Sequence, residues 1–384
     1  MKQYFVDSTG EVLEIEVPNY TALNKLRKKY RMATVNERVD FIHGVNHREE
    51  TLAKEKHLHD IFYMAPTKNV DGYGNSSVNI KRRIVDRGIH LNTLHQGQNV
   101  GLCYHLPNTL SLVKTPIKIS YTMFESDQYP KFWEPWLKMA DHVLVPTQFC
   151  ADVMEKNFGV VPEVVPLGYD PDFFYFLDRS NRPDGHKFTF LHFDAFKWRK
   201  GWDLIFQAFT EEFDEAEPVK LVFKTTLGIT PPFNQYPNIE KISGKLPQEE
   251  MYEVLRDADC FVFPSRGEGF GLTPLEAMAT GLRAIIPNHT GMATYFDDRY
   301  CHGLEFEQIN AKYDNTELRT LDLGHQWQPT LHSLKMAMRA EFEDWKAKGN
   351  QLDMVHSKEV SEYAKGFTIE KTVDKLAEVL KRFA

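Results

Sequence analysis

The sequence predicts an α/β protein with two doubly wound lobes that face a cleft, preceded by an N-terminal extension. Three observations lead to this fold. The 384 residues suffice for two or three domains. Short apolar segments alternate with helical segments from about residue 59 and again from about residue 187, which is typical of parallel sheets connected by helices. A turn-rich stretch separates the two series.

The composition is that of a soluble globular protein. Hydrophobic residues make up 42% and charged residues 26%, which excludes a disordered chain or a coiled-coil rod. No segment approaches the ~20 apolar residues of a membrane span, and the first residues show no export signal, so we expect a cytoplasmic protein. The net charge of -8 argues against a general nucleic-acid coat. Four scattered cysteines without a Cys-x-x-Cys pair indicate reduced thiols.

We divide the chain into an N-terminal extension, a first Rossmann-like lobe, a linker, a second Rossmann-like lobe and a C-terminal helical segment. In chain order, these parts cover residues 1–58, 59–175, 176–186, 187–355 and 356–384. The extension is expected to begin with a hairpin over 1–18 and to continue as a polar, mostly helical stretch. The C-terminal helix is expected to dock on a lobe, because its apolar residues share one face.

Strands are expected where several apolar residues follow one another. In the first lobe these segments are 61–64, 100–104, 117–121 and 142–145. In the second lobe they are 188–193, 219–224, 260–263 and 284–286, with helices near 201–213, 247–257 and 273–280.

The strongest site signal follows the strand over 260–263, where a glycine-rich turn leads into a helix. Thr273 is the expected N-cap of this helix, and Pro274 its first residue. Glycines let the backbone approach a ligand, and the free N–H groups at a helix start favour a diphosphate. Glu268 and Glu276 flank the turn, where their carboxylates can accept hydrogen bonds from hydroxyl groups.

A weaker signal lies in the first lobe. Gly72 and Gly74 follow the strand over 61–64 and are expected on the first βα loop, which faces the cleft in such folds. Because glycine has no side chain, an acceptor or a donor phosphate could approach the backbone at these two positions. An ordinary turn explains the two glycines equally well.

The segment FVFPSRGEGFGLTPLEAMATG, in which Glu268 and Glu276 are separated by seven residues, resembles the signature of retaining GT-B glycosyltransferases. It is most similar to glycosyltransferase family 4, and matching context extends over roughly residues 60–345. The resemblance implies a nucleotide-diphosphate sugar in the second lobe, with Glu276 on the ribose hydroxyls and Glu268 on the donor sugar. The backbone of Phe270, Gly271 and Leu272 would contact the sugar and the phosphates.

Members of this family neutralise the diphosphate with the lysine of a Lys-Gly pair and an arginine six residues earlier. Here Lys200 precedes a glycine, but Asp194 occupies the earlier position. Lys197 or Arg199 is therefore expected to supply the second positive charge. Without the resemblance, basic residues placed like these before a helix are more often a solvated charge run. Many members also carry a pocket histidine in the first lobe, where this sequence offers Glu125 as the best candidate.

The resemblance implies an enzyme of hexosyltransferase type that transfers a sugar with retention of anomeric configuration. A UDP-glucose-like donor is favoured, and neither a permanently bound cofactor nor a metal is expected. A metal-dependent transferase using Asp257 and Asp259 is the competing interpretation of the site. A non-catalytic nucleotide-sugar or glycan-binding module is the alternative from another functional class.

The acceptor stays open at this point. Residues 25–31 and 81–83 are rich in lysine and arginine, which fits a polyanionic acceptor such as viral DNA with hydroxymethylated bases. A glycan or a lipid-linked glycan would be another hydroxyl acceptor. A solvated helix surface explains the same basic residues without any acceptor.

Overall fold

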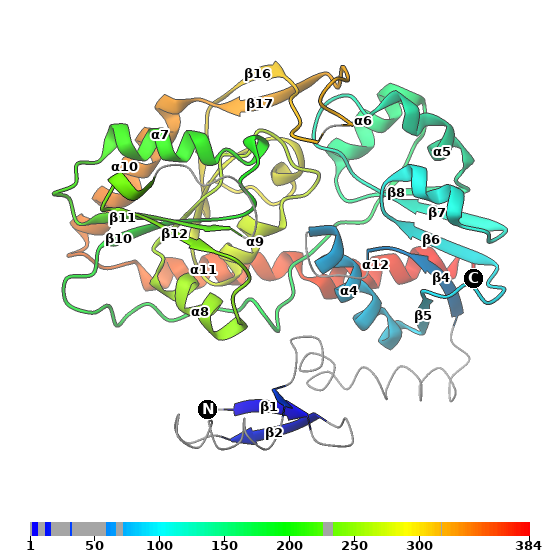
Figure 1. Ribbon diagram of the computed structural model, residues 1–384, viewed down its shortest axis with the longest axis horizontal. Coiled ribbons are helices and arrows are strands. Elements are labelled where there is room, and N and C mark those ends of the chain that lie inside the picture. The colour runs from blue at the N-terminus through cyan, green and yellow to red at the C-terminus, as the bar shows by residue number, and fades with distance from the viewer. Residues whose placement is uncertain are drawn as a thin grey trace.

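The computed structural model describes the backbone of residues 2–6, 12–16 and 31–32, and residues 59–66, 72–225, 233–315 and 317–384. Two lobes lie side by side, each built on a six-stranded parallel sheet covered by helices (Figure 1). The predicted fold class is therefore confirmed. The predicted hairpin is also present, because β1 (Lys2–Val6) pairs antiparallel with β2 (Val12–Glu16). A short third strand, β3 (Arg31–Met32), pairs with β1, and the rest of the predicted helical stretch lies outside the described residues.

The sheet of the first lobe contains the four predicted strands and two that the sequence did not reveal, β5 and β9. In spatial order its strands are β5 (Ile89–Asn92), β4 (His59–Met64), β6 (Val100–Tyr104), β7 (Ile117–Tyr121), β8 (His142–Val145) and β9 (Glu163–Val164). Its helices are α4 (Gly72–Ile84), α5 (Glu134–Met139) and α6 (Gln148–Phe158), with 3₁₀ turns η1 (Val85–Arg87), η2 (Pro107–Leu112) and η3 (Lys131–Trp133). All five residues of β6 are buried, as expected for a strand covered on both faces.

The second lobe repeats this plan. In spatial order its strands are β12 (Ile239–Ser243), β11 (Val219–Thr225), β10 (Phe188–Phe193), β13 (Cys260–Val262), β14 (Arg283–Pro287) and β15 (Cys301–Leu304). Its helices are α7 (Trp202–Glu212), α8 (Gln248–Asp257), α9 (Leu272–Ala279), α10 (Leu331–Ala347) and α11 (Met354–Ala364), with 3₁₀ turns η4 (Trp198–Lys200), η5 (Phe233–Gln235), η6 (Thr290–Thr294) and η7 (Lys365–Phe367). Strands β12 and β15 were not predicted, because each contains few consecutive apolar residues.

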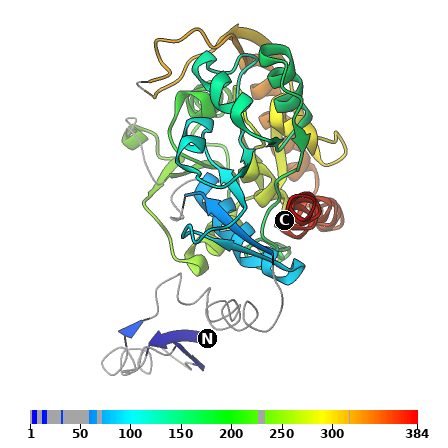
Figure 2. The same ribbon diagram turned by 90° about the vertical axis from the view of Figure 1, so that its right-hand side faces the viewer.

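The C-terminal helix α12 (Ile369–Lys381) returns to the first lobe and lies against α4 (Figures 1 and 2). Its buried face includes Val373, Leu376, Val379 and Leu380. At its start, Glu370 forms ion pairs with Arg83 and Arg87 of the first lobe. The chain segment between the sheets is also anchored, since the buried guanidinium of Arg179 donates to the carbonyl oxygens of Leu255 and Ala258, both at 3.1 Å or less.

A β-hairpin, here called the arm (residues 306–329), extends from the second lobe over the first (Figure 1). It contains β16 (Phe306–Asn310) and β17 (His325–Pro329), which pair antiparallel, and the sequence did not reveal it. Tyr313 of the arm stacks on Phe124 of the first lobe at a centroid distance of 5.2 Å. Asp127 of the first lobe accepts a hydrogen bond from the backbone N–H of His325 at 2.6 Å.

The four cysteines are buried and unpaired. Within the described residues, no helix combines the length and the apolar character needed to cross a bilayer.

Candidate active site

The candidate site lies where the strand order of the second lobe reverses. Strand β10 is central, the chain then adds β11 and β12 on one side, and it returns to place β13 and β14 on the other. Ligands of open α/β sheets bind beyond the carboxyl ends of the strands at such a point. Here the segments after β10 and β13 meet, because Arg266 N donates to Arg199 O at 2.8 Å.

Glu268 lies at the centre of a group of charged side chains where these two segments meet. Its carboxylate contacts Arg199 Nη1 at 2.9 Å and Lys200 Nζ at 3.0 Å, and it accepts from the Ser265 hydroxyl at 2.7 Å. Burial alone would raise the pKa of this carboxyl, but Arg199 and Lys200 outweigh burial and hold its pKa at about 2. Glu268 is therefore ionised throughout the neutral range, and its oxygen atoms act as acceptors.

Arg199 connects the two lobes. In addition to its contact with Glu268, its Nη2 lies 3.1 Å from an Oε atom of Glu125 in the first lobe. The structure thus brings the predicted residues Arg199, Lys200, Glu125 and Glu268 together. The side chain of Lys197 is exposed instead, so Arg199 is the second cation in this group.

The glycine-rich turn lies directly against the first lobe. A Cβ atom on Gly267 would lie 2.1 Å from the carbonyl oxygen of Glu125, and one on Gly269 would lie 2.7 Å from the side chain of Met123. Thr147 of the first lobe also donates to the Gly269 carbonyl at 3.2 Å. The turn therefore contains glycine because the lobes meet there without room for side chains.

Helix α9 begins two residues earlier than the sequence predicted. Gly271 is the N-cap residue, with a φ of 87° that favours glycine, and Leu272 is the first helical residue. The prediction of Thr273 as N-cap and Pro274 as first residue is wrong, because the Thr273 hydroxyl donates to Asp194 at 3.3 Å instead of capping the helix. The backbone of Phe270, Gly271 and Leu272 still forms the start of this helix.

Glu276 lies in the second turn of α9 and is half-buried. Within the described residues its carboxylate makes no hydrogen bond or ion pair. Burial, together with the negative charges of Asp194 and Asp170, raises the pKa of this carboxyl to about 8. A group in this state can accept hydrogen bonds from a ligand without first losing a partner.

Gly72 and Gly74 are not on a loop. They lie in the first turn of α4, because the buried Ser76, Ser77 and Ile80 give the segment a helical face that begins there. Between the two glycines, the Tyr73 hydroxyl accepts a hydrogen bond from Met123 N at 3.1 Å. The start of α4 is thereby held next to the loop that contacts Gly269.

The competing metal interpretation is not supported by the partners of its two carboxylates. Asp257 forms an ion pair with Lys220 at 2.6 Å. Asp259 is buried and pairs with Arg182 and with His186 Nε2, the latter at 2.7 Å. Across the ranges that the structure describes, no cluster of three or more His, Cys, Asp or Glu side chains is arranged to hold a metal ion.

Sequence reasoning missed Thr290, whose hydroxyl contacts the backbone of Glu268. Glu268 N donates to the Thr290 hydroxyl at 3.1 Å, and Gly291 N donates to Glu268 O at 2.8 Å. Thr290 has a φ of 52°, and such conformations are costly for threonine and occur at functional sites. The available signal was its position three residues after the carboxyl end of β14, the neighbour of β13.

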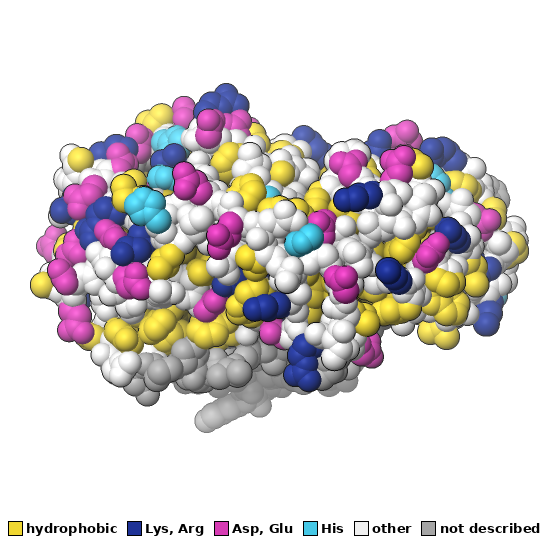
Figure 3. Space-filling model, turned by 90° about the horizontal axis from the view of Figure 1, so that it is seen from above, with side chains coloured by type: hydrophobic (Ala, Val, Ile, Leu, Met, Phe, Trp, Pro, Cys, Tyr) yellow, Lys and Arg dark blue, Asp and Glu magenta, His cyan; other side chains and the backbone are white. Residues whose placement is uncertain are grey.

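The arginines of the predicted basic surface have partners. Arg82 is buried and pairs with Asp170, and Arg83 pairs with Asp170 and with Asp172, the latter at 2.7 Å. Residues 81–83 therefore do not present an open basic face, and residues 25–30 lie outside the described residues. On the face that carries the arm, lysines and arginines are interspersed with acidic side chains (Figure 3).

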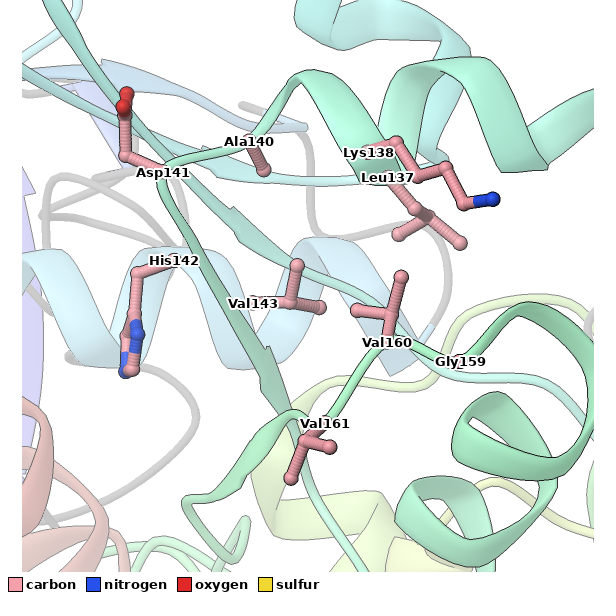
Figure 4. Close-up of a pocket in the computed structure, with 9 residues that line it drawn as sticks. All are labelled: Leu137, Lys138, Ala140, Asp141, His142, Val143, Gly159, Val160 and Val161. Carbon is pink, nitrogen blue, oxygen red and sulfur yellow. The ribbon is translucent and has the colours of Figure 1, made fainter.

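A pocket in the first lobe lies away from this group. It has a volume of about 300 Å³, and its lining combines apolar residues with Lys138, Asp141 and His142. Leu137, Val143 and Val160 are turned toward one another, and Lys138 points away (Figure 4). It adjoins His142, the first residue of β8, whereas ligands of such sheets bind beyond the carboxyl ends. The group around Glu268, at the carboxyl ends of its sheet, is therefore the candidate site.

Two Rossmann-like lobes joined by a returning C-terminal helix, with a glycine-rich turn and helix start at the interface, define a GT-B fold. The solved structure of sucrose-phosphate synthase from Thermosynechococcus elongatus is similar, with a TM-score of 0.60 and 13% identity over 84% of this chain and 98% of that chain. Anabaena HepE in complex with UDP-glucose has a TM-score of 0.57 and 11% identity over 84% of this chain and 99% of that chain.

The match to a sequence family lies in the second lobe. Residues 237–314 match the family described as glycosyl transferases group 1, and this range contains β13, the glycine-rich turn and α9. A stretch of 179 residues, 40% of this chain, is 28% identical to mannosylfructose-phosphate synthase from Agrobacterium fabrum. That match spans 39% of the length of the relative. The chain thus has a GT-B fold, and residues 237–314 are similar to the group 1 glycosyltransferases.

Proposed function

We propose that this protein is a retaining glycosyltransferase, similar to family 4, that moves a sugar from a nucleotide-diphosphate sugar to a hydroxyl acceptor. The observation that carries the proposal is the group of Glu268, Arg199 and Lys200 beside the start of α9, next to Glu276, which has no partner among the described residues. A diphosphate is bound by cations and free N–H groups, and sugar hydroxyls by carboxylates. This group offers both kinds of contact.

The roles follow from these positions. Glu276 accepts hydrogen bonds from the ribose hydroxyls, and Glu268 accepts them from the donor sugar. Lys200 and Arg199 face the diphosphate, and the backbone N–H groups of Gly271 and Leu272 at the start of α9 donate hydrogen bonds to it. The two lobes already touch through the ion pair of Arg199 and Glu125, so donor binding and release require them to separate.

The proposed reaction needs no protein nucleophile. As the bond between the sugar and the diphosphate breaks, negative charge grows on the departing diphosphate and is stabilised by Lys200 and Arg199. A phosphate oxygen of the donor takes the proton of the attacking acceptor hydroxyl on the same face of an oxocarbenium-like sugar, which retains the configuration. Lobe closure excludes water, which would otherwise hydrolyse the donor.

The first donor to test is UDP-glucose, the ligand named for the HepE complex. A thermal-shift screen should compare UDP-, GDP-, ADP- and CDP-sugars, followed by calorimetry with the nucleotide that stabilises the protein. Glu276→Gln should weaken binding, whereas Asp297→Asn, a control on the exposed surface of the same lobe, should not. Failure of every nucleotide sugar to bind would reject the proposed function.

Transfer is tested with the bound donor and three acceptor classes, namely glycans, lipid-linked glycans and DNA with hydroxymethylated bases. NMR of the anomeric proton in the product distinguishes retention from inversion. Donor binding without hydrolysis or transfer to any acceptor would favour the non-catalytic nucleotide-sugar-binding module. An inverted product would reject the retaining mechanism while leaving the donor site in place.

A further inference from the structure

Asp194 is an acidic residue inside the proposed donor site. It follows β10 directly, and its Oδ2 accepts hydrogen bonds from Lys200 Nζ at 2.9 Å and from the Thr273 hydroxyl at 3.3 Å. Its Oδ1 accepts from the backbone N–H of Ala195 at 2.6 Å. The carboxylate is therefore fixed between the lysine and the first turn of α9.

Lys200 is held from two sides. Glu268 contacts its ammonium at 3.0 and 3.1 Å, and Asp194 contacts it from another direction, while the ring of Phe263 lies 5.3 Å from Nζ. An ammonium group has three N–H donors and a flexible stem, so two carboxylates are enough to fix its position. Without Asp194, the flexible side chain of Lys200 would be held by Glu268 alone.

The charge of Asp194 also opposes that of an incoming diphosphate. Phosphate groups at the start of α9 would share Lys200 with Asp194, and two negative charges a few ångströms apart repel each other strongly inside a protein. A neutral residue at this position would remove that repulsion and leave the whole positive charge of Lys200 for the ligand.

We propose that Asp194 is a positioning residue that fixes Lys200 at the start of α9 and lowers the affinity of the site for the nucleotide-diphosphate product. This inference rests on the proposed function. It gives Asp194 two effects of opposite sign, since it supports the chemical step through Lys200 and weakens the bound state of the product. Loss of Asp194 should therefore tighten nucleotide binding and slow turnover.

The test measures binding of UDP, GDP and ADP by calorimetry, using the full chain. For the nucleotide that the wild type binds, Asp194→Asn should lower the Kd about tenfold, because one repulsive charge is removed. The comparison is made at about pH 9, where Glu276 is ionised with or without the charge of Asp194. Binding of the matching nucleoside should not change there, because it carries no phosphate. Asp297→Asn, which removes the same charge at the surface, should leave both affinities unaltered.

A structural role for Asp194 predicts the opposite result, since a damaged site binds more weakly. Equal or weaker diphosphate binding by Asp194→Asn, or the same gain for the nucleoside, would overturn the inference. Asp194→Ser, which can still accept from Thr273, should also bind the diphosphate more tightly and serves if the asparagine variant fails to fold. If the wild type binds no nucleotide, the proposed function fails and this inference fails with it. If the wild type binds a nucleotide but the variants do not bind it more tightly, this inference alone fails.

Where transfer can be assayed, the expected signature is a lower kcat together with a lower KM for the donor. Product inhibition by the nucleotide diphosphate should become stronger in the same proportion as its Kd falls. A kcat unchanged from that of the wild type would contradict the positioning of Lys200 by Asp194.

Discussion

Glu276→Gln should change how the stability of the protein depends on pH. In the folded protein, burial and the charges of Asp194 and Asp170 raise the pKa of Glu276 from its ordinary value of 4.5 to about 8. Between these two values the folded state holds a proton that the unfolded state has lost. The free energy of unfolding of the wild type therefore falls as the pH rises through this range. Glutamine has nearly the same shape and no proton to lose.

The size of the effect follows from the two pKa values. Each pH unit between 4.5 and about 8 removes at most ~1.4 kcal/mol from the free energy of unfolding. Between about pH 6 and pH 7.5 the wild type should thus lose up to ~2 kcal/mol relative to Glu276→Gln. The half-buried position of Glu276 makes this figure an upper limit, because solvent reduces the cost of the charge.

Urea unfolding of both proteins at several pH values from about 5.5 to 8.5 measures this difference, and the comparison cancels the titration of all other groups. Nucleotide binding supplies a second measurement, because the ionised carboxylate is the better acceptor for ribose hydroxyls. Wild-type affinity should rise with pH, and the glutamine variant should bind more weakly by about 1–3 kcal/mol above pH 8. If the difference in the free energy of unfolding between the two proteins is constant with pH, the pKa of Glu276 is not raised in the folded state. If Glu276→Gln leaves the nucleotide affinity unchanged, Glu276 does not belong to the nucleotide site.

Three further predictions concern the cations, the arm and the lobe junction. Lys200→Ala should lower kcat about 100-fold with a smaller change in KM, and a kcat near that of the wild type would contradict the role of Lys200. Wild-type turnover should survive EDTA, and activity that is lost in chelator and restored by Mg²⁺ would contradict this expectation. Asp127→Ala removes the contacts of Asp127 with His325 and should therefore speed tryptic cleavage within the arm severalfold, as measured by mass spectrometry. An unchanged cleavage rate would show that these contacts do not hold the arm in place. Arg82→Gln should lower the free energy of unfolding by about 3–5 kcal/mol, because it leaves Asp170 buried with one partner fewer. A change below about 1 kcal/mol in urea unfolding would show that this ion pair does not stabilise the fold.

The sequence predicted the parts of the fold whose residues repeat a local pattern. The strand over 100–104 consists of apolar or small residues and is buried along its whole length, so its composition alone identified it. Strand β12 has the sequence Ile-Glu-Lys-Ile-Ser and lies at the edge of its sheet, where polar residues are tolerated and the apolar run is interrupted. Edge strands and the arm are defined by their neighbours in space, and a local pattern does not contain that information.

The same distinction applies to the candidate site. Glu268 and Glu276 were predicted because they flank a glycine-rich turn, and Lys200 because it precedes a glycine. The contacts of Lys200 with Glu268 join the connection after β10 to the turn after β13, two segments 68 residues apart, so no local spacing predicted them. Local sequence thus named the residues of the group, and the order of the strands determined which of them meet.

The basic residues of the first lobe show why a charge run is an ambiguous signal. Arg82 and Arg83 look like part of an exposed cationic surface in sequence, but their partner Asp170 follows 88 positions after Arg82 and is buried beside them. Buried ion pairs of this kind hold elements together and offer no charge to a polyanion. The prediction of a polyanionic acceptor therefore depends on residues 25–31 alone. Charge reversal at Lys28, followed by acceptor assays over a range of salt concentrations, separates a polyanionic acceptor from a neutral one without disturbing the junction of α4 and Asp170.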